Sequence, residues 1–233
     1  MKAVHVFQHT SAEYLGLIED HLEGRNIRFR YCRPFAGKNP FPKPEALLDG
    51  VIVLGGGPWG SAGERDVPTL AQEIGLVRIA LEKQKPVIGI GLGAQILALA
   101  AGGRSERAPL EFSVGRARRV KEGALYGYLP AEYPLALYMR DWPVPPAGAE
   151  ILAADERGRP VLWKIGEQAL AFAGHPGLKV AMVEDLVMEF EEAPQEIGPA
   201  LDALRATQRN IEDALVPIMA GVIRLTGWMQ PPA

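Results

Sequence analysis

Residues 86–103, with the sequence PVIGIGLGAQILALAAGG, are the stretch that most constrains the fold of this chain. The stretch opens with a short β-branched apolar run, which predicts a buried strand, and closes with good helix formers and a Gly-Gly pair that predict a helix and its end. Alternate glycines separate the two, where they permit a sharp turn with backbone amides facing open space. Such a turn is typical of a nucleophile elbow, whose central residue carries the reactive side chain. The central residue here is Gly91, so the predicted elbow has no nucleophile.

Strands and helices alternate along the first half of the chain. The apolar pattern predicts strands at 3–8, 27–32 and 51–54, a helix from an N-cap at Ser11 to about Glu23, and a helix over 68–84. This alternation predicts a parallel α/β sheet with right-handed crossovers. Ligands bind such sheets beyond the carboxyl ends of the strands, so we expect the glycine-rich turns 55–60 and 89–93 to face one pocket.

The second half changes to shorter elements and ends in a helical stretch. We expect a hairpin over 151–163, a strand over 169–173 and a helix over 179–190. From Glu196 onward, apolar residues recur at helical spacing, with Gln208 interrupting the pattern and Pro217 kinking it into a helix pair. These helices either cover the protein's own sheet or dock a second subunit. The expected organisation is therefore a domain over 1–192 and a C-terminal helical extension over 193–233.

Composition excludes several classes of function. A formal net charge of -3 gives no reason to expect nucleic acid or anionic membranes as partners. The glycines and the proline of 86–103 argue against a membrane span, although the length would permit one. The single cysteine, Cys32, excludes an internal disulfide framework and fits a reducing compartment, which predicts a cytoplasmic protein. Four histidines and one cysteine match no common metal-ligand spacing, so no metal or other cofactor is expected.

Four blocks of the sequence resemble one known family. Residues 86–103 resemble the nucleophile segment of the class I glutamine amidotransferases, in which a cysteine stands in place of Gly91; the other matching blocks are VLGGGP at 53–58, PPAGAEILAA at 145–154 and QALAFAGHPG at 168–177. The blocks occur in the family's order, over about residues 1–192. The resemblance implies a flavodoxin-like, Rossmann-type three-layer α/β sandwich with a mainly parallel central sheet, here followed by the C-terminal helical appendage.

The same resemblance assigns roles to single positions. The family's triad of cysteine, histidine and glutamate corresponds to Gly91, His175 and Gly177, so two of its three members are glycine. The oxyanion donors would be the amides of Gly57 and Leu92, and Gln95 matches a residue that helps hold the substrate.

Because no thioester forms without a thiolate, we expect a protein without glutaminase activity. It would act as a binding or scaffolding subunit. Its partners would be a glutamine-like molecule in the pocket, or a protein or second copy bound through the C-terminal helices.

Two other functions stay open at this point. An active amidotransferase or hydrolase would use His175 to activate water directly. A nucleotide-binding protein would use GIGLGA at 89–94, which satisfies G-x-G-x-x-[GA], with Glu111 some twenty residues further on. A basic run, formed by Arg116, Arg118, Arg119 and Lys121, is interpreted as a solvated sheet edge, with a phosphate or acidic partner as the alternative.

Overall fold

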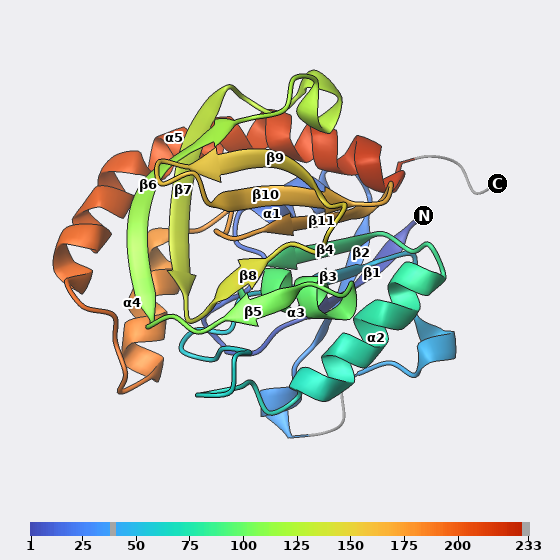
Figure 1. Ribbon diagram of the computed structural model, residues 1–233, viewed down its shortest axis with the longest axis horizontal. Coiled ribbons are helices and arrows are strands. Elements are labelled where there is room, and N and C mark those ends of the chain that lie inside the picture. Colours follow the sequence, from blue (N-terminus) through green and yellow to red (C-terminus); the bar gives the residue numbers. More distant parts are fainter. Residues whose placement is uncertain (38–40, 230–233) are drawn as a thin grey trace.

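A nine-stranded sheet runs through the centre of the protein (Figure 1). Its strand order is β2 (Arg28–Cys32), β1 (Ala3–Phe7), β3 (Val51–Val53), β4 (Val87–Ile90), β11 (Ala169–Phe172), β10 (Pro160–Ile165), β9 (Glu150–Asp155), β6 (Glu111–Arg119) and β7 (Glu132–Met139). Neighbours from β2 to β11 are parallel, and those from β11 to β7 are antiparallel. The computed structural model describes residues 1–37 and 41–229, and in it β5 (Arg104–Glu106) and β8 (Trp142–Val144) form a separate small sheet.

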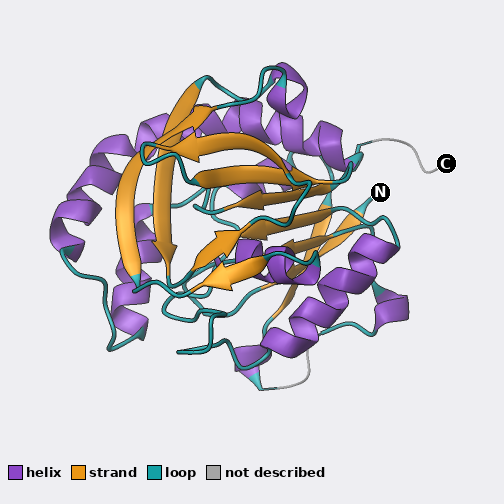
Figure 2. Ribbon diagram, in the orientation of Figure 1, coloured by secondary structure: helices purple, strands orange, loops and turns teal. Residues whose placement is uncertain are grey.

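Helices cover both faces of the sheet. Apolar residues of α1 (Ile18–Glu23) and α5 (Ile197–Thr226) share one core cluster with the sheet, and those of α2 (Leu70–Glu82) and α3 (Leu92–Ala100) form the core on the other face. A third cluster joins α4 (Val180–Glu189) to α5 and to β6 and β7. Figure 2 shows α5 along one side of the sheet and α2 on the opposite side. The predicted three-layer α/β sandwich is confirmed, with a sheet that is mixed rather than uniformly parallel.

The segment 86–103 folds as the sequence predicts. It forms strand β4, a tight turn at Gly91 and helix α3, and both elements are buried. Within the described residues, no helix combines the length and apolar character needed to cross a membrane. The hairpin over β9 and β10 and the strand β11 are also confirmed.

The helix predicted from Ser11 is wrong in its first half. Only Ile18–Glu23 is helical, and the Ser11 hydroxyl donates to Glu189 at 2.8 Å instead of capping a helix. Gly16 has a φ of 61°, a left-handed conformation that ends any helix passing through it. Residues 10–17 are therefore a loop that follows β1 at the carboxyl edge of the sheet.

The C-terminal stretch is one continuous helix, so the predicted break into a helix pair is wrong. The Gln208 side chain lies against the start of α4, where its Nε2 donates to the carbonyl of Leu178 and its Oε1 accepts from the amide of Val180, each at 3.2 Å. The apolar face of α5 packs on the protein's own sheet, as one of the two expectations stated. The division into residues 1–192 and 193–233 stays a prediction.

Two neighbouring residues of α5 test this packing. Leu215 is 1% exposed and belongs to the sheet-facing core, whereas Val216 is 56% exposed. We expect Leu215→Ala to lower the free energy of unfolding by about 2–5 kcal/mol through the cavity that it leaves. Val216→Ala should change it by less than about 0.5 kcal/mol. Urea unfolding monitored by circular dichroism measures both, and similar losses in the two variants would contradict the packing described.

Candidate active site

Three neighbouring strand ends meet at the carboxyl edge of the sheet. Strand β4 pairs in parallel with β3 on one side and β11 on the other, so the turns that follow these strands lie together. Gly91 has φ 58° and ψ −115°, a conformation that only glycine adopts without strain. A β-carbon at position 91 would lie 3.4 Å from the Gly55 α-carbon and 4.0 Å from the Ala173 carbonyl oxygen. The elbow geometry is therefore present, with room for the first atom of a side chain.

His175 follows β11, and the backbone uses both of its ring nitrogens. Its Nε2 donates to the carbonyl of Tyr14 at 2.9 Å, and its Nδ1 accepts from the amide of Gly177 at 3.1 Å. This pattern requires the neutral ring with its proton on Nε2. Burial lowers the pKa of His175 to about 4, although the bond to Tyr14 acts in the opposite direction. In this arrangement His175 has no free lone pair with which to act as a base.

Gly177 allows the loop after β1 to lie over His175. A β-carbon at position 177 would come within 3.1 Å of the Ile18 amide nitrogen and 3.3 Å of the Leu17 β-carbon. Gly16 comes closer still from the other side, because a β-carbon there would lie 2.3 Å from the Gly177 carbonyl oxygen. The amide of Leu17 also donates to that carbonyl at 3.0 Å. The glycine at 177 thus makes space for residues 14–18.

Glu13, on the same loop, reaches the expected oxyanion position. Its carboxylate accepts a hydrogen bond from the amide of Gly57, and its side chain is buried, with the residue only 2% exposed. A β-carbon at position 55 would lie 1.9 Å from Glu13 Oε1, so the Glu13 carboxyl lies directly against the Gly55 backbone. Burial raises the pKa of Glu13 to about 7, against the lowering effects of the Gly57 hydrogen bond and of the charge on His9.

A buried ion pair between His9 and Glu73 of α2 fixes the loop after β3. His9 Nε2 lies 2.8 Å from Glu73 of α2, and His9 Nδ1 lies 2.8 Å from the carbonyl oxygen of Gly55. Burial alone lowers the pKa of His9, but the charge and hydrogen bond of Glu73, with help from Gly55, raise it overall. The imidazolium that results donates from both nitrogens. It fixes the carbonyl of Gly55 beside the Glu13 carboxyl.

Gln95 is fully buried, and the protein's own groups occupy its amide. Its Oε1 accepts from the Ser61 hydroxyl at 2.6 Å, and its Nε2 donates to the carbonyl of Arg140 at 2.6 Å. Asp141 completes the clamp, since its carboxylate accepts from the amides of Ser61 at 2.8 Å and Ala62 at 2.9 Å. The assigned role of Gln95 as a substrate contact stays a prediction. In this structure the residue ties the loop after β3 to the segment before β8.

The glycine turn does not present a row of free amides to a phosphate. The amide of Gly93 donates to the carbonyl of Leu54 at 3.1 Å, and that of Ala94 donates to Gly91 at 3.0 Å. Leu92, at the first helical position, is 1% exposed, and its side chain packs against the loop at Gly56. A dinucleotide pyrophosphate needs such amides unpaired and accessible. Because the amides of Gly93 and Ala94 are already hydrogen-bonded within the chain, the turn does not favour the nucleotide-binding alternative.

Cys32 does not replace the absent nucleophile. It ends β2, is 1% exposed, and its sulfur lies 3.6 Å from His5 Nδ1. Burial raises the pKa of its thiol to about 11, so the thiol is protonated at neutral pH.

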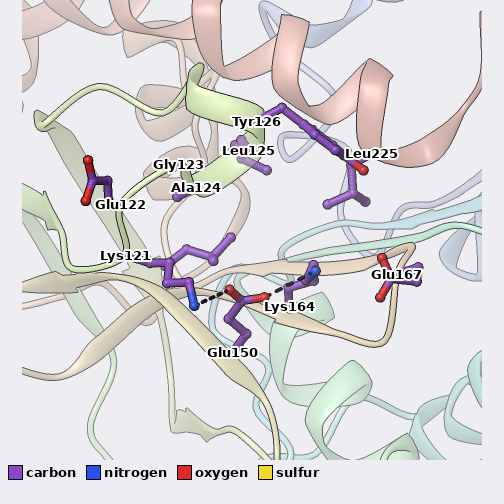
Figure 3. Close-up of a pocket in the computed structure, with 11 residues that line it drawn as sticks. Lys121, Glu122, Gly123, Ala124, Leu125, Tyr126, Glu150, Lys164, Glu167 and Leu225 are labelled. Carbon is purple, nitrogen blue, oxygen red and sulfur yellow. Dashed lines mark ion pairs between the residues drawn. The ribbon is translucent and has the colours of Figure 1, made fainter.

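Ion pairs engage three residues of the basic run. Arg116 and Arg118 share Glu132, with Arg118 2.8 Å from it, and Lys121 lies 3.1 Å from Glu150. These side chains are solvent-exposed, as expected, but β6 pairs with β7 along its length and with β9 at residues 117–119, so the end of the strand that carries Arg118 and Arg119 is not a sheet edge. Figure 3 shows Lys121 and Lys164 on the two oxygens of Glu150 in a cavity of about 170 Å³. With Glu122 and Glu167 in its lining, this cavity has no excess of positive charge for a phosphate.

The fold brings most of the predicted site residues to one place, but the sequence analysis missed Glu13. Gly57, Gly91, Leu92 and His175 all follow adjacent strands, and Gly177 contacts the His175 ring. The sequence pattern does not indicate Glu13, because the apolar spacing over residues 11–17 predicts a helix rather than a loop at the site. Gly16, in the middle of that stretch, is the signal that could have identified a loop.

Known proteins share this architecture. The family model described as glutamine amidotransferase class-I matches residues 33–175. A glutamine amidotransferase from Methylobacillus flagellatus superposes with a TM-score of 0.80 at 22% identity, over 97% of this chain and 96% of that one. A glutamine amidotransferase from Thermotoga maritima superposes with a TM-score of 0.79 at 22% identity, over 97% and 98%. No curated protein sequence matches the chain significantly.

Two glycines in left-handed conformations test the contact over His175. Gly16 has φ +61° and touches Gly177, whereas Gly166 has φ +54° and would meet nothing within 4 Å if it carried a β-carbon. Gly166→Ala should cost about 1–2 kcal/mol of stability from backbone strain alone. Gly16→Ala should cost more, because its methyl group forces the loop off Gly177. Chemical denaturation measures both losses; equal values would show that residues 14–18 do not pack as described.

Proposed function

Because the chain belongs to the class I glutamine amidotransferases, we propose that it is a member that does not hydrolyse glutamine and that serves as a binding or scaffolding subunit. One observation carries this proposal. The turn at Gly91 keeps the elbow conformation, with φ 58° and ψ −115°, but has no side chain to present.

The absence of a thiol at position 91 has a larger effect on the expected rate of glutamine hydrolysis than any feature that the site retains. Glutamine hydrolysis in this family proceeds through attack on the side-chain amide, and no acyl-enzyme forms without the nucleophile. Loss of the nucleophile from a catalytic triad reduces the rate about a millionfold. The second glycine supports the same conclusion, because Gly177 has no carboxyl group to orient His175 and the 14–18 segment lies tightly against it.

The active alternative needs a base, and His175 is not one in this arrangement. Direct activation of water requires a free ring nitrogen, whereas Nε2 donates to Tyr14 and Nδ1 accepts from Gly177. Burial also lowers the pKa of the ring to about 4, which makes it a weak base.

One proposed partner follows from the family, and the other follows from the outer side of α5. A glutamine-like molecule in the pocket, or a protein or second copy against the outer side of α5, would give the chain its role. The single buried cysteine, Cys32, fits a reducing compartment such as the cytoplasm.

An ammonia-release assay with glutamine tests the proposal. We expect no release above the enzyme-free rate from the natural chain, and the same result from His175→Ala. The double variant Gly91→Cys, Gly177→Glu restores the triad residues, and we expect partial activity at best, because Glu13 holds the Gly57 amide. Turnover like that of ordinary glutaminases in the natural chain, abolished by His175→Ala, would overturn the proposal.

A further inference from the structure

The cavity drawn in Figure 3 lies at the edge of the sheet opposite the turn at Gly91. Ile165, at the end of β10, pairs with Ala169 of β11, which in turn pairs with Val87 at the start of β4. Gly91 follows the end of β4, so Lys164 and the cavity that it lines lie at the other end of these strands. We propose that this cavity binds a small zwitterion with an apolar side chain, an apolar α-amino acid. Such a site is independent of the function proposed for the turn at Gly91.

Charges of alternating sign form one wall of the cavity. Glu150 of β9 and Lys164 of β10 are cross-strand partners, and their charged groups lie 3.2 Å apart. The amide of Val120 donates to the carbonyl of Leu152 at 2.9 Å, which brings Lys121 beside β9 and 3.1 Å from the other oxygen of Glu150. Hydrogen bonds from both lysines hold the pKa of Glu150 below its ordinary value, so its carboxylate is ionised at neutral pH.

This wall is complementary to the head group of an α-amino acid. Such a molecule carries its ammonium and carboxylate groups on one carbon atom. The ammonium can donate to Glu150 while the carboxylate accepts from Lys121 or Lys164, and the net charge of the wall does not change.

Leucine side chains form the opposite wall. Leu125, Leu152 and Leu225 come from the β6–β7 connection, from β9 and from α5, and each is at most 5% exposed. Figure 3 shows Leu125 and Leu225 across from the ion pairs of Glu150. An apolar side chain of the ligand is stabilised by burial against them, whereas a polar side chain would lose its water without gaining a partner.

The volume and charge of the cavity restrict the ligand further. The volume is about 170 Å³, whereas sites for drug-sized ligands measure roughly 300–1,000 Å³, so a molecule no larger than a single amino acid fits. The lining includes Lys121 and Lys164 but also Glu122, Glu150 and Glu167. This balance disfavours a simple anion and favours a ligand that brings its own positive charge.

The connection between β6 and β7 forms a fixed lip of the cavity. Leu125 and Tyr126 have left-handed backbone conformations, with φ 49° and 60°, which residues other than glycine rarely adopt. Helix α5 holds them there, since a β-carbon on Gly221 would lie 2.6 Å from Leu125 Cβ and the Arg224 guanidinium lies 4.7 Å from the centre of the Tyr126 ring. Strained residues that their surroundings hold in place are typical of ligand-binding sites, and here they keep one side of the cavity formed.

Thermal unfolding in the presence of L-leucine tests the site. We expect a saturable rise of the unfolding midpoint, by about 3–6 °C at a tenfold excess over the dissociation constant. Isocaproate lacks the ammonium group and isoamylamine lacks the carboxylate, so each should give a much smaller rise at the same concentration. No rise with leucine, or an equal rise with either analogue, would overturn the inference.

Two matched variants locate the binding. Glu150→Gln removes the charged acceptor for the ammonium group and should raise the dissociation constant of leucine about tenfold or more. Glu132→Gln is the control, because Glu132 is likewise shared by two basic side chains, those of Arg116 and Arg118, but does not line the cavity. It should respond to leucine as the natural chain does. A response that persists unchanged in Glu150→Gln, or that both variants lose equally, contradicts the proposed site.

A titration of the natural chain by amide NMR needs no variant. Leucine should shift the amide signals of Leu152 and Lys164 with one dissociation constant and leave those of Gly57 and Gly91 unchanged. Shifts at Gly57 and Gly91 with none at the cavity would show that leucine binds elsewhere and would overturn the inference. The ammonia-release assay is unaffected by either outcome, so this site and the proposed function fail separately.

Discussion

The parallel pairing of β4 between β3 and β11 is the constraint on which the rest of this structure depends. It places the turn at Gly91, the loop at 55–57 and His175 side by side, whatever side chains they carry. Backbone geometry alone therefore preserves the outline of an active site. The elbow keeps its left-handed conformation because β4 and α3 are buried and determine the path of the chain between them.

Residues of the loop after β1 occupy the hydrogen-bonding groups of this site. The carbonyl of Tyr14 in this loop accepts the Nε2 proton of His175, and the amide of Gly177, after β11, donates to His175 Nδ1. The Glu13 carboxyl of the same loop accepts from the Gly57 amide. The two glycines at the predicted triad positions differ in their consequences. Gly91 leaves a small open space, whereas Gly177 admits the loop.

Buried polar groups make this arrangement specific. The His9–Glu73 pair and the clamp formed by Gln95, Ser61 and Asp141 hold the loop after β3 from both sides. Removing one partner from such a network leaves an unsatisfied buried group, which is more costly than the bond itself is stabilising. Glu13 and Tyr138 are different, because the first has a single backbone donor and the second has no partner in the described chain.

The sequence by itself determined the strand–turn–helix at 86–103, the alternation of strands and helices, and the absence of a thiol at the elbow. Those features follow from local periodicity and glycine placement, which neighbours in the chain decide. The sequence pattern did not determine the path of residues 10–17, because an apolar spacing of three and four residues fits a helix whether or not a left-handed Gly16 interrupts it. The pattern also did not determine the continuity of α5. The tertiary structure alone decided that the Glu13 carboxyl accepts from the Gly57 amide and that His175 donates to the carbonyl of Tyr14. Both contacts join residues far apart in the chain, and burial rather than sequence spacing sets their protonation.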